Sequence, residues 1–187
     1  MLSKKELRKA VKAKRQELSP EYYASASQKI TDRLLKSEAY QEAQCIFTFL
    51  TMPREFDTEA LIRQAWQDGK TIVVPRVESM GQMSLRRYDQ GDELILSSLN
   101  IEEPSPEAEI VPLESIDWVT LPCMTCNPKG ERLGYGGGFY DRFLAQYQGR
   151  ISLPYFEELM VDDIPMDPHD HLVPHIVTEK AEYFPGR

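Results

Sequence analysis

The sequence is poor in several features that would narrow its function at once. Its three cysteines, Cys45, Cys123 and Cys126, are too few and too odd in number for a disulfide framework and fit a reducing compartment better. It lacks an apolar run near the length of a membrane span and a basic, apolar leader, so we expect a soluble, cytoplasmic protein without membrane partners. It also lacks an excess of positive charge: the formal net charge of −8 argues against general nucleic-acid binding.

Two clusters of potential metal ligands are present, but their spacing fits no metal or redox site. Cys123 and Cys126 have the spacing of a redox pair or of half a zinc site, yet matched partner ligands are missing and no thioredoxin-like unit begins there. The segment 165–174 is rich in Asp and His, but prolines interrupt it and no His pair has the i,i+4 spacing of a helix. The sequence therefore favours neither a zinc site nor a redox centre.

Length and patterning indicate one domain that combines helices and strands. The chain has 187 residues, 41% hydrophobic and 28% charged, which is enough for one well-buried core and short for two. No repeat or linker divides it, so we expect residues 1–187 to form a single α/β domain. Amphipathic spacing predicts helices at 4–18, 20–36 and 57–66, and apolar runs predict strands at 45–50, 71–76, 83–88, 116–121, 151–153 and 175–178.

The order of these segments indicates a mainly parallel sheet. A helix between the strands 45–50 and 71–76 makes a βαβ unit. The region 89–112 holds many turn formers and few periodic signals, which is typical of a surface excursion. The expected fold class is α/β, a three-layer sandwich with a mainly parallel sheet flanked by helices.

Glycine is concentrated in one loop, where Gly134, Gly136, Gly137 and Gly138 are four of the ten glycines in the chain. Apolar residues at helical spacing follow from Phe139, so the loop is predicted to lead into a helix. Backbone N–H groups of such a loop and of the first helical turn bind anions well. The loop matches neither a Walker A nor a Rossmann signature, and a surface turn would have the same composition.

The neighbours of this loop favour an anion site over a plain turn. Arg132 stands just before it, the aromatic pair Phe139-Tyr140 stands at its exit, and Asp141 falls in the first turn of the helix. Asp141 is placed either to interact with the helix dipole or to hold Mg²⁺ against a bound phosphate.

The first predicted helix carries an excess of positive charge. Its basic residues outnumber its acidic ones, with Lys4, Lys5, Arg8, Lys9, Lys12, Lys14 and Arg15 against Glu6 and Glu17. We assign its apolar face to Leu7, Ala10, Val11, Leu18 and the aliphatic stem of Lys14. The basic residues either form a solvated face, or Lys4 and Arg8, one turn apart, contact a phosphate chain together.

Polar residues follow two predicted strands at their carboxyl ends, where ligands of open parallel sheets collect. The strand 45–50 leads into Leu50-Thr51-Met52-Pro53-Arg54-Glu55, and the strand 116–121 leads to Pro122, just ahead of the glycine loop. Glu55 taken alone is a loop carboxylate near a helix start.

The glycine loop and its flanks also carry a family resemblance. Arg132-Leu133-Gly134, then Gly136 and Gly138, then Phe139-Tyr140-Asp141-Arg142, resembles the signature of the 5-formyltetrahydrofolate cyclo-ligases, also called methenyltetrahydrofolate synthetases. Other segments are similar to the family in the same order: Lys4 to Arg8, Leu50 to Glu55, Ile101 to Pro104, and Asp170 to Glu179.

This resemblance implies the ATP-driven cyclisation of 5-formyltetrahydrofolate to 5,10-methenyltetrahydrofolate, giving ADP and phosphate, with ATP as co-substrate and Mg²⁺ as the metal. We expect a monomer. The implied ATP contacts are Lys4, Lys5, Glu6, Leu7, Arg8, Arg132, Leu133, Gly134, Tyr135, Gly136, Gly137, Gly138, Phe139 and Tyr140. The other implied roles are catalysis for Arg132 and Tyr140, Mg²⁺ binding for Asp141 and Asp170, and pterin binding for Leu50, Met52 and Glu55. A carboxylate such as Glu55 can accept two hydrogen bonds from an amino-pyrimidine edge.

The chain departs from the family pattern at three positions. Asn127 stands where the family usually has Asp, Leu159 where it often has Gln, and Pro174 where it has Asp. These departures leave open a non-catalytic module that binds a nucleotide or a folate. Another enzyme on a similar sheet, such as a sugar-phosphate isomerase, is a second alternative, which would need a carboxylate base near the loop and no ATP.

Overall fold

One seven-stranded sheet organises the computed structural model, which describes residues 1–187. Its strand order is β11-β10-β9-β6-β1-β2-β3. The bounds are β1 (Cys45–Phe47), β2 (Thr71–Ser79), β3 (Gln82–Arg87), β6 (Trp118–Thr120), β9 (Arg150–Pro154), β10 (Ile176–Val177) and β11 (Glu182–Tyr183). All neighbours from β10 to β2 pair in parallel, and the edge strands β11 and β3 pair antiparallel to theirs.

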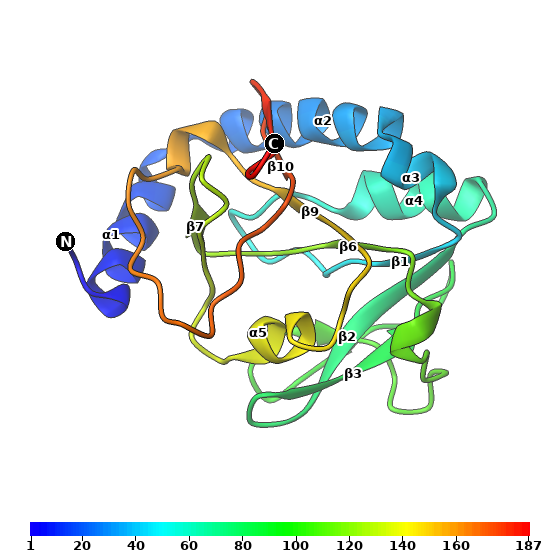
Figure 1. Ribbon diagram of the computed structural model, residues 1–187. Helices are drawn as coiled ribbons and strands as arrows, with labels where there is room; N and C mark the ends of the chain where they lie inside the picture. Colours follow the sequence, from blue (N-terminus) through cyan, green and yellow to red (C-terminus); the bar gives the residue numbers. More distant parts are fainter.

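Helices cover both faces of this sheet (Figure 1). The helices are α1 (Lys4–Glu17), α2 (Pro20–Lys36), α3 (Glu38–Glu42), α4 (Glu59–Gln67) and α5 (Phe139–Leu144), with 3₁₀ turns at Leu113–Ser115 and Glu157–Leu159. In Figure 1, α2, α3 and α4 lie on one face and α5 lies on the other. The predicted fold class, an α/β sandwich with a mainly parallel sheet flanked by helices, is confirmed, as is the parallel βαβ unit made by β1, α4 and β2.

Local sequence explains where the first two helices begin. Ser3 caps α1 by accepting a hydrogen bond from the Glu6 N–H, and the Glu6 side chain accepts one from the Ser3 N–H, which completes a capping box. Ser19 caps α2 in the same way, and Pro20 follows at the first helical position, where its missing N–H costs nothing. Both helices therefore start within a residue of their predicted positions.

The core lies between the sheet and its helices. A single cluster of 31 buried hydrophobic residues includes Ile46, Phe47, Ile72 and Trp118 from the central strands. A small second cluster joins Leu7 and Val11 of α1 to Leu133 and Ile164. Burial of apolar surface therefore fixes α1 to the segment that carries the glycine loop.

Several short elements differ from expectation. The predicted strand 45–50 ends at Phe47, and the strand 175–178 shrinks to Ile176–Val177. The hairpin of β7 (Thr125–Cys126) and β8 (Arg132–Leu133), together with α3 and β11, has no counterpart in the prediction. The two-residue strands are too short for a period of two to show in the sequence.

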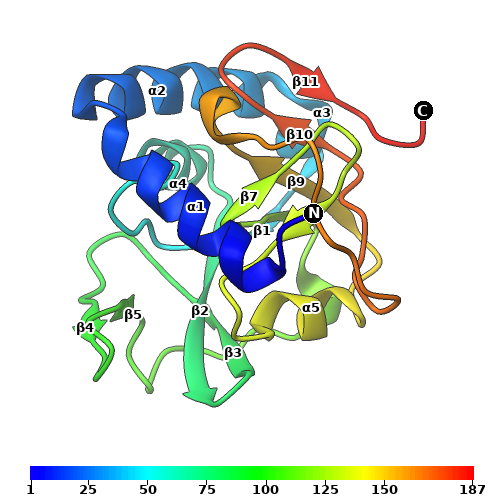
Figure 2. The ribbon, with the colours of Figure 1, turned by 90° about the vertical axis from the view of Figure 1, so that its left-hand side faces the viewer.

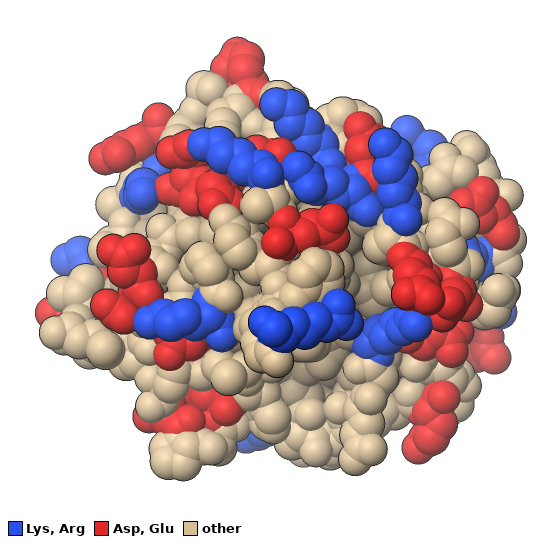
Figure 3. Space-filling view, turned by 45° about the horizontal axis from the view of Figure 1, so that its top comes forward, with Lys and Arg blue, Asp and Glu red and all other residues tan.

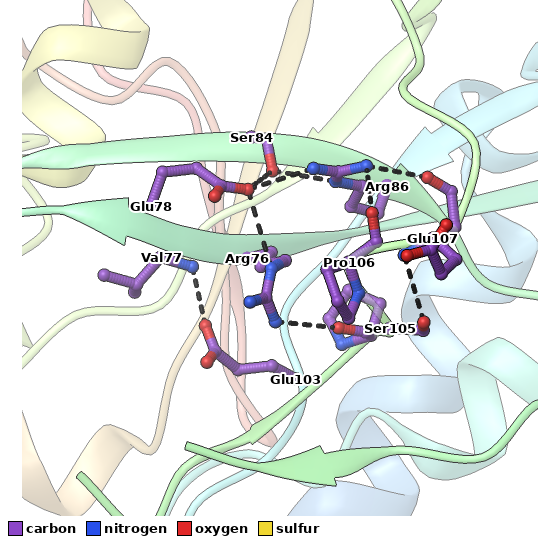
Figure 4. A network of polar contacts seen from close by, with 11 residues as sticks. Arg76, Val77, Glu78, Ser84, Arg86, Glu103, Ser105, Pro106 and Glu107 are labelled. Carbon is purple, nitrogen blue, oxygen red and sulfur yellow. Dashed lines mark hydrogen bonds and ion pairs between the residues drawn. The ribbon is translucent and has the colours of Figure 1, made fainter. Parts of the chain in front are cut away.

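The predicted surface excursion 89–112 contains its own ordered pieces. The strands β4 (Ile95–Leu96) and β5 (Glu102–Glu103) pair antiparallel within it. The buried Glu103 side chain accepts a hydrogen bond of 2.6 Å from the Val77 N–H, and Arg76 donates to the Pro104 carbonyl at 3.2 Å. Arg86 donates to the Pro106 carbonyl at 3.1 Å, so the β2–β3 hairpin holds the excursion by side chains of both strands (Figure 4).

Charges of both signs are mixed on the face that α2 covers (Figure 3). Lys29, Arg33 and Lys36 of α2 share a hollow of about 520 Å³ with Glu179 and Glu182. No helix has the length and apolar character needed to cross a membrane.

Replacing Glu103 tests how the excursion is held. Glu103→Ala is expected to lower the free energy of unfolding by about 1–3 kcal/mol, because the Val77 N–H loses its acceptor. Chemical denaturation measures this, with Glu102→Ala, an exposed neighbour, as the matched control. Equal losses in the two variants would contradict an anchoring role for Glu103.

Candidate functional site

The predicted site residues gather where the parallel strands end. Figure 2 looks onto this end of the sheet, with α1 crossing in front of it. The loop after β1, the segment after β6 and the glycine loop all reach this region, because Arg15 of α1 contacts Cys123 and Tyr135, and Tyr135 contacts Glu55.

Two basic residues of α1 contact the predicted site directly. The Lys4 ammonium lies 2.7 Å from a carboxylate oxygen of Asp170 and 2.7 Å from one of Asp167. The Arg8 Nε donates to the Gly134 carbonyl at 2.9 Å, which leaves its terminal nitrogens free to bind elsewhere. The structure thus brings Lys4 to Asp170 and Arg8 to the glycine loop, although 126 residues or more separate the partners.

The carboxylates of Asp167 and Asp170 stabilise the charged form of Lys4. Burial acts to lower the pKa of Lys4, but the hydrogen bonds and charges of Asp167 and Asp170 outweigh it and raise that pKa. Burial acts in turn to raise the pKa of Asp170, while the Asp167 N–H and Lys4 lower it on balance. Both groups are therefore charged near neutral pH.

The other three α1 residues predicted to contact ATP have different positions. Lys5 is exposed, and the Glu6 side chain is used in the capping box. Leu7 is 7% exposed and packs into the small cluster with Leu133, which is 1% exposed. Their contact with ATP stays a prediction.

Arg132 is held rigidly by one carbonyl group. Its Nε and Nη2 donate to the Pro122 carbonyl at 3.0 and 2.8 Å. The remaining terminal nitrogen, Nη1, lies 3.7 Å from a carboxylate oxygen of Asp141, and the guanidinium lies 5.6 Å from the centre of the Tyr140 ring. Nη1 is therefore the guanidinium nitrogen of Arg132 that has no direct hydrogen bond.

Two residues of the glycine loop have a positive φ, a backbone conformation that favours glycine. Gly136 has a φ of 102° and lies beside the Arg8 guanidinium, where a Cβ would come within 3.6 Å of Arg8 Cζ. Gly138 has a φ of 75° and caps α5, so both positions lie in a region that other residues avoid. The prediction of a glycine loop that leads into a helix is confirmed, with Phe139 as the first residue of α5.

Tyr140 packs against the central sheet. Its ring stacks on Phe47 of β1, with ring centres 6.2 Å apart. Burial raises the pKa of Tyr140, although the nearby Arg132 opposes the shift. The hydroxyl is therefore protonated at physiological pH and can act as a hydrogen-bond donor.

The residues predicted to bind the pterin line one cavity. It has a volume of about 660 Å³, and Leu50, Met52 and Glu55 are among its lining residues. The Glu55 carboxylate accepts hydrogen bonds from the Met52 N–H at 2.8 Å and from the Tyr135 hydroxyl at 2.6 Å. Burial raises the pKa of Glu55, opposed by these two hydrogen bonds and by the charge of Arg15.

The two predicted metal ligands have separate partners. Asp170 belongs to a group with Asp167 and His169, whose potential ligand atoms lie within 4.8 Å of one another. Asp141 is outside that group and faces Arg132. Carboxylate oxygens are suitable ligands for Mg²⁺, so the donor chemistry of Asp141 and Asp170 fits this ion. Their joint binding of a metal stays a prediction.

Arg15 is a site residue that the sequence analysis missed. It is 7% exposed and donates to the Tyr135 hydroxyl at 3.1 Å and to the Cys123 and Met124 carbonyls at 2.8 Å each. The predicted apolar face of α1 included the stem of Lys14, which is exposed. The available signal was the spacing of Leu7, Val11 and Arg15, each four residues after the last on one helical face.

The Cys-x-x-Cys segment is buried beside this arginine. Both Cys123 and Cys126 carry free thiols and are 3% and 0% exposed. Burial, with a contribution from Cys123, raises the pKa of Cys126, so this thiol stays protonated.

Two departures from the family pattern have a structural role here. Asn127 is fully buried, and its amide donates to the Glu131 carboxylate at 2.7 Å and to the Asp162 carbonyl at 3.3 Å. An aspartate could not make either bond. Leu159 is fully buried in the main core. Pro174 is exposed and lines a hollow with His175, at the start of β10.

Comparison with known proteins adds independent findings. A family model described as the 5-formyltetrahydrofolate cyclo-ligase family matches residues 1–179. The 5-formyltetrahydrofolate cyclo-ligase of Escherichia coli (strain K12) is 30% identical over 174 residues, covering 90% of this chain and 96% of that protein. The Mus musculus enzyme of the same name is 30% identical over 192 residues, covering 96% and 95%. The solved structure of 5,10-methenyltetrahydrofolate synthetase from Aquifex aeolicus matches with a TM-score of 0.86 and 29% identity, covering 98% of this chain and 93% of that one.

Substituting Asn127 tests its role in the turn before the glycine loop. Asn127→Asp is expected to lower the free energy of unfolding by about 2 kcal/mol at pH 7, because two donors are lost and a carboxylate faces Glu131. Burial and Glu131 raise the pKa of such a carboxyl in the folded state, so the loss should shrink as the pH falls toward about 4.

Denaturation curves at several pH values measure this loss. Adding Glu131→Gln to Asn127→Asp should recover part of it, because the new amide can donate to the new carboxylate. A loss independent of pH, or no recovery in the double variant, would contradict this account.

Proposed function

The chain belongs to the 5-formyltetrahydrofolate cyclo-ligase family, and from this premise we propose that the protein cyclises 5-formyltetrahydrofolate to 5,10-methenyltetrahydrofolate in an ATP- and Mg²⁺-dependent reaction that releases ADP and phosphate. One observation carries the proposal. A cluster of cationic side chains and a glycine loop adjoin a cavity of about 660 Å³, and the Tyr135–Glu55 hydrogen bond joins the two parts. We further propose that residues 1–187 act as one domain, as a monomer, in the cytoplasm.

The cationic cluster is suited to the phosphates of ATP. Arg8 keeps its terminal nitrogens beside Gly136, and Arg132 keeps Nη1 near Gly134. Backbone N–H groups from Gly134 to Gly138 add donors at the start of α5, and Lys4 adds a charge from α1. These groups would hold the phosphates in line with the folate.

The neighbouring cavity is suited to the folate. Its volume falls within the range of small-molecule sites, and its lining combines apolar side chains with a few polar groups. Glu55 would accept two hydrogen bonds from the amino-pyrimidine edge of the pterin, with Leu50 and Met52 against the ring.

The chemistry needs positioning more than acid–base groups. The formyl oxygen of the substrate is a poor leaving group, so it first attacks the γ-phosphorus of ATP, and the bond from that phosphorus to ADP breaks. The N10 atom then attacks the formyl carbon, the carbon–oxygen bond breaks, and phosphate leaves while N10 releases its proton to solvent. Arg132 would stabilise negative charge on the phosphoryl group during transfer, and the Tyr140 hydroxyl would act as a nearby donor.

The proposed metal ligands are Asp141 and Asp170. Their carboxylate oxygens have the chemistry that Mg²⁺ prefers, and Mg²⁺ would neutralise charge on the phosphates when bound. In the free protein, Arg132 and Lys4 balance the charges of these two carboxylates. No observation on the site favours an isomerase that works without a nucleotide.

The first experiment follows the absorbance of the methenyl product. The protein is mixed with 5-formyltetrahydrofolate, Mg²⁺ and ATP, beside a control without ATP. A rise that requires ATP is expected, and it should disappear when a chelator removes Mg²⁺. Binding of ATP and folate without turnover would overturn the proposal and favour a non-catalytic module.

Replacing Arg132 tests its proposed part in phosphoryl transfer. Arg132→Lys keeps the positive charge but loses the double contact with the Pro122 carbonyl, so the charge is no longer held in place. We expect kcat to fall by about 100-fold or more, with a small change in KM for folate. Steady-state kinetics measures both values, with Arg142→Lys, an exposed change on α5, as the control. A loss confined to KM for folate would contradict the assignment.

A further inference from the structure

A chain of hydrogen bonds links α1 to the folate side of the site. Arg15 Nη1 donates to the Tyr135 hydroxyl at 3.1 Å, and that hydroxyl donates to the Glu55 carboxylate at 2.6 Å. The three residues come from α1, the glycine loop and the loop after β1. The sequence separations are 120 and 80 residues, so no local pattern produces this contact.

Arg15 itself has little freedom to move. Its Nη2 donates to the carbonyls of Cys123 and Met124, and its guanidinium lies 5.6 and 5.9 Å from the ring centres of Tyr135 and Tyr155. Because Arg15 is only 7% exposed, the surrounding fold fixes the orientation of its side chain. It therefore gives the Tyr135 hydroxyl a stationary donor.

The direction of each hydrogen bond follows from the groups involved. A guanidinium can only donate, so the Tyr135 oxygen accepts from Arg15 and turns its own hydrogen toward Glu55. The other Glu55 oxygen accepts from the Met52 N–H at 2.8 Å. A carboxylate has about four lone-pair positions, so each oxygen retains one for a ligand. Tyr135 and Met52 thus fix the plane of the carboxylate without filling it.

On these grounds we propose that Arg15 is a positioning residue for folate binding, which acts through the Tyr135 hydroxyl to hold the Glu55 carboxylate ready for the amino-pyrimidine edge. This inference rests on the proposed function, because it assigns a supporting group to the pterin acceptor. Arg15 does not touch the substrate in this arrangement. Its effect passes through the Tyr135 hydroxyl, which contacts Glu55 on the folate side.

The same contacts favour the ionised form that the acceptor needs. Burial raises the pKa of Glu55, and the Tyr135 hydroxyl, the Met52 N–H and the charge of Arg15 oppose that rise. The other charged groups on the walls of the cavity are Arg54, Asp57, Glu59, Arg63 and Glu102, and Arg63 is paired with Glu59. Removing the Tyr135 hydroxyl should therefore leave Glu55 protonated up to a higher pH.

Tyr135→Phe is the decisive variant. It removes the hydroxyl but keeps the ring against Arg15, whereas Arg15→Met also frees two backbone carbonyls and risks the fold. For Tyr135→Phe we expect KM for 5-formyltetrahydrofolate to rise about tenfold at pH 7, because Glu55 loses a hydrogen bond that orients its charged carboxylate. KM for ATP should change less than about twofold, because the variant keeps the ring and the backbone of the glycine loop. The acid limb of kcat/KM for folate should move to higher pH.

Tyr155→Phe is the matched control. Tyr155 also packs against Arg15 and donates to the Met124 carbonyl, but it has no contact with Glu55. Its loss should leave the KM for folate and the acid limb in place. Calorimetric titration with 5-formyltetrahydrofolate alone gives a readout that does not depend on turnover, and affinity should fall in Tyr135→Phe only.

The possible outcomes separate the two proposals. If the unmodified protein binds and turns over folate, but Tyr135→Phe leaves folate affinity unchanged or increases it, the positioning role is wrong. Equal losses for ATP and folate, or for both tyrosine variants, would also overturn it in favour of a structural role. If the unmodified protein binds no folate at all, the proposed function itself fails and takes this inference with it.

Discussion

Three consecutive backbone carbonyls hold the site together. Pro122, Cys123 and Met124 follow β6 at the point where the chain leaves the sheet, and buried arginines donate to all three. Arg132 donates to the Pro122 carbonyl, and Arg15 donates to the carbonyls of Cys123 and Met124. A buried carbonyl without a donor costs free energy, and a buried guanidinium without acceptors costs more. The three carbonyls accept from the two guanidiniums, and Arg15 Nε is the buried nitrogen of the pair that has no partner. These contacts fix α1 and the glycine loop relative to the sheet.

This arrangement also explains how an acidic protein can offer a site for anions. The chain has a net charge of −8, but four cationic side chains, Lys4, Arg8, Arg15 and Arg132, converge at one end of the sheet. Two of them are balanced by aspartates in the free protein. Local fields depend on which charges lie within a few ångströms, because more distant charges on the surface are screened. The net charge therefore argues against a surface for nucleic acid, but it does not argue against a local site for phosphate.

The sequence predicted most of the architecture because the architecture depends on local pattern. Apolar runs located the central strands, amphipathic spacing located the first two helices, and the glycine cluster located the loop before α5. The family resemblance supplied Lys4, Arg8, Arg132 and Glu55, which the fold brings to one end of the sheet; their roles in binding stay predictions. Arg15 was missed because a charged residue on a basic helix is usually solvated. In the structure Arg15 is 7% exposed, and it donates to the Cys123 and Met124 carbonyls.

For two residues of the site, the sequence did not reveal which groups they contact. Tyr135 was predicted to contact ATP, yet its hydroxyl meets Glu55, 80 residues earlier, on the folate side. Asn127 was identified only as a departure from the Asp of the family pattern, and its amide donates to Glu131 and to the Asp162 carbonyl in a buried turn. In both cases the residue type indicated the available chemistry, but the sequence did not indicate the contact partner. A pattern of residue types predicts which chemistry is available, whereas the three-dimensional contact decides whether that chemistry serves the ligand or supports the fold.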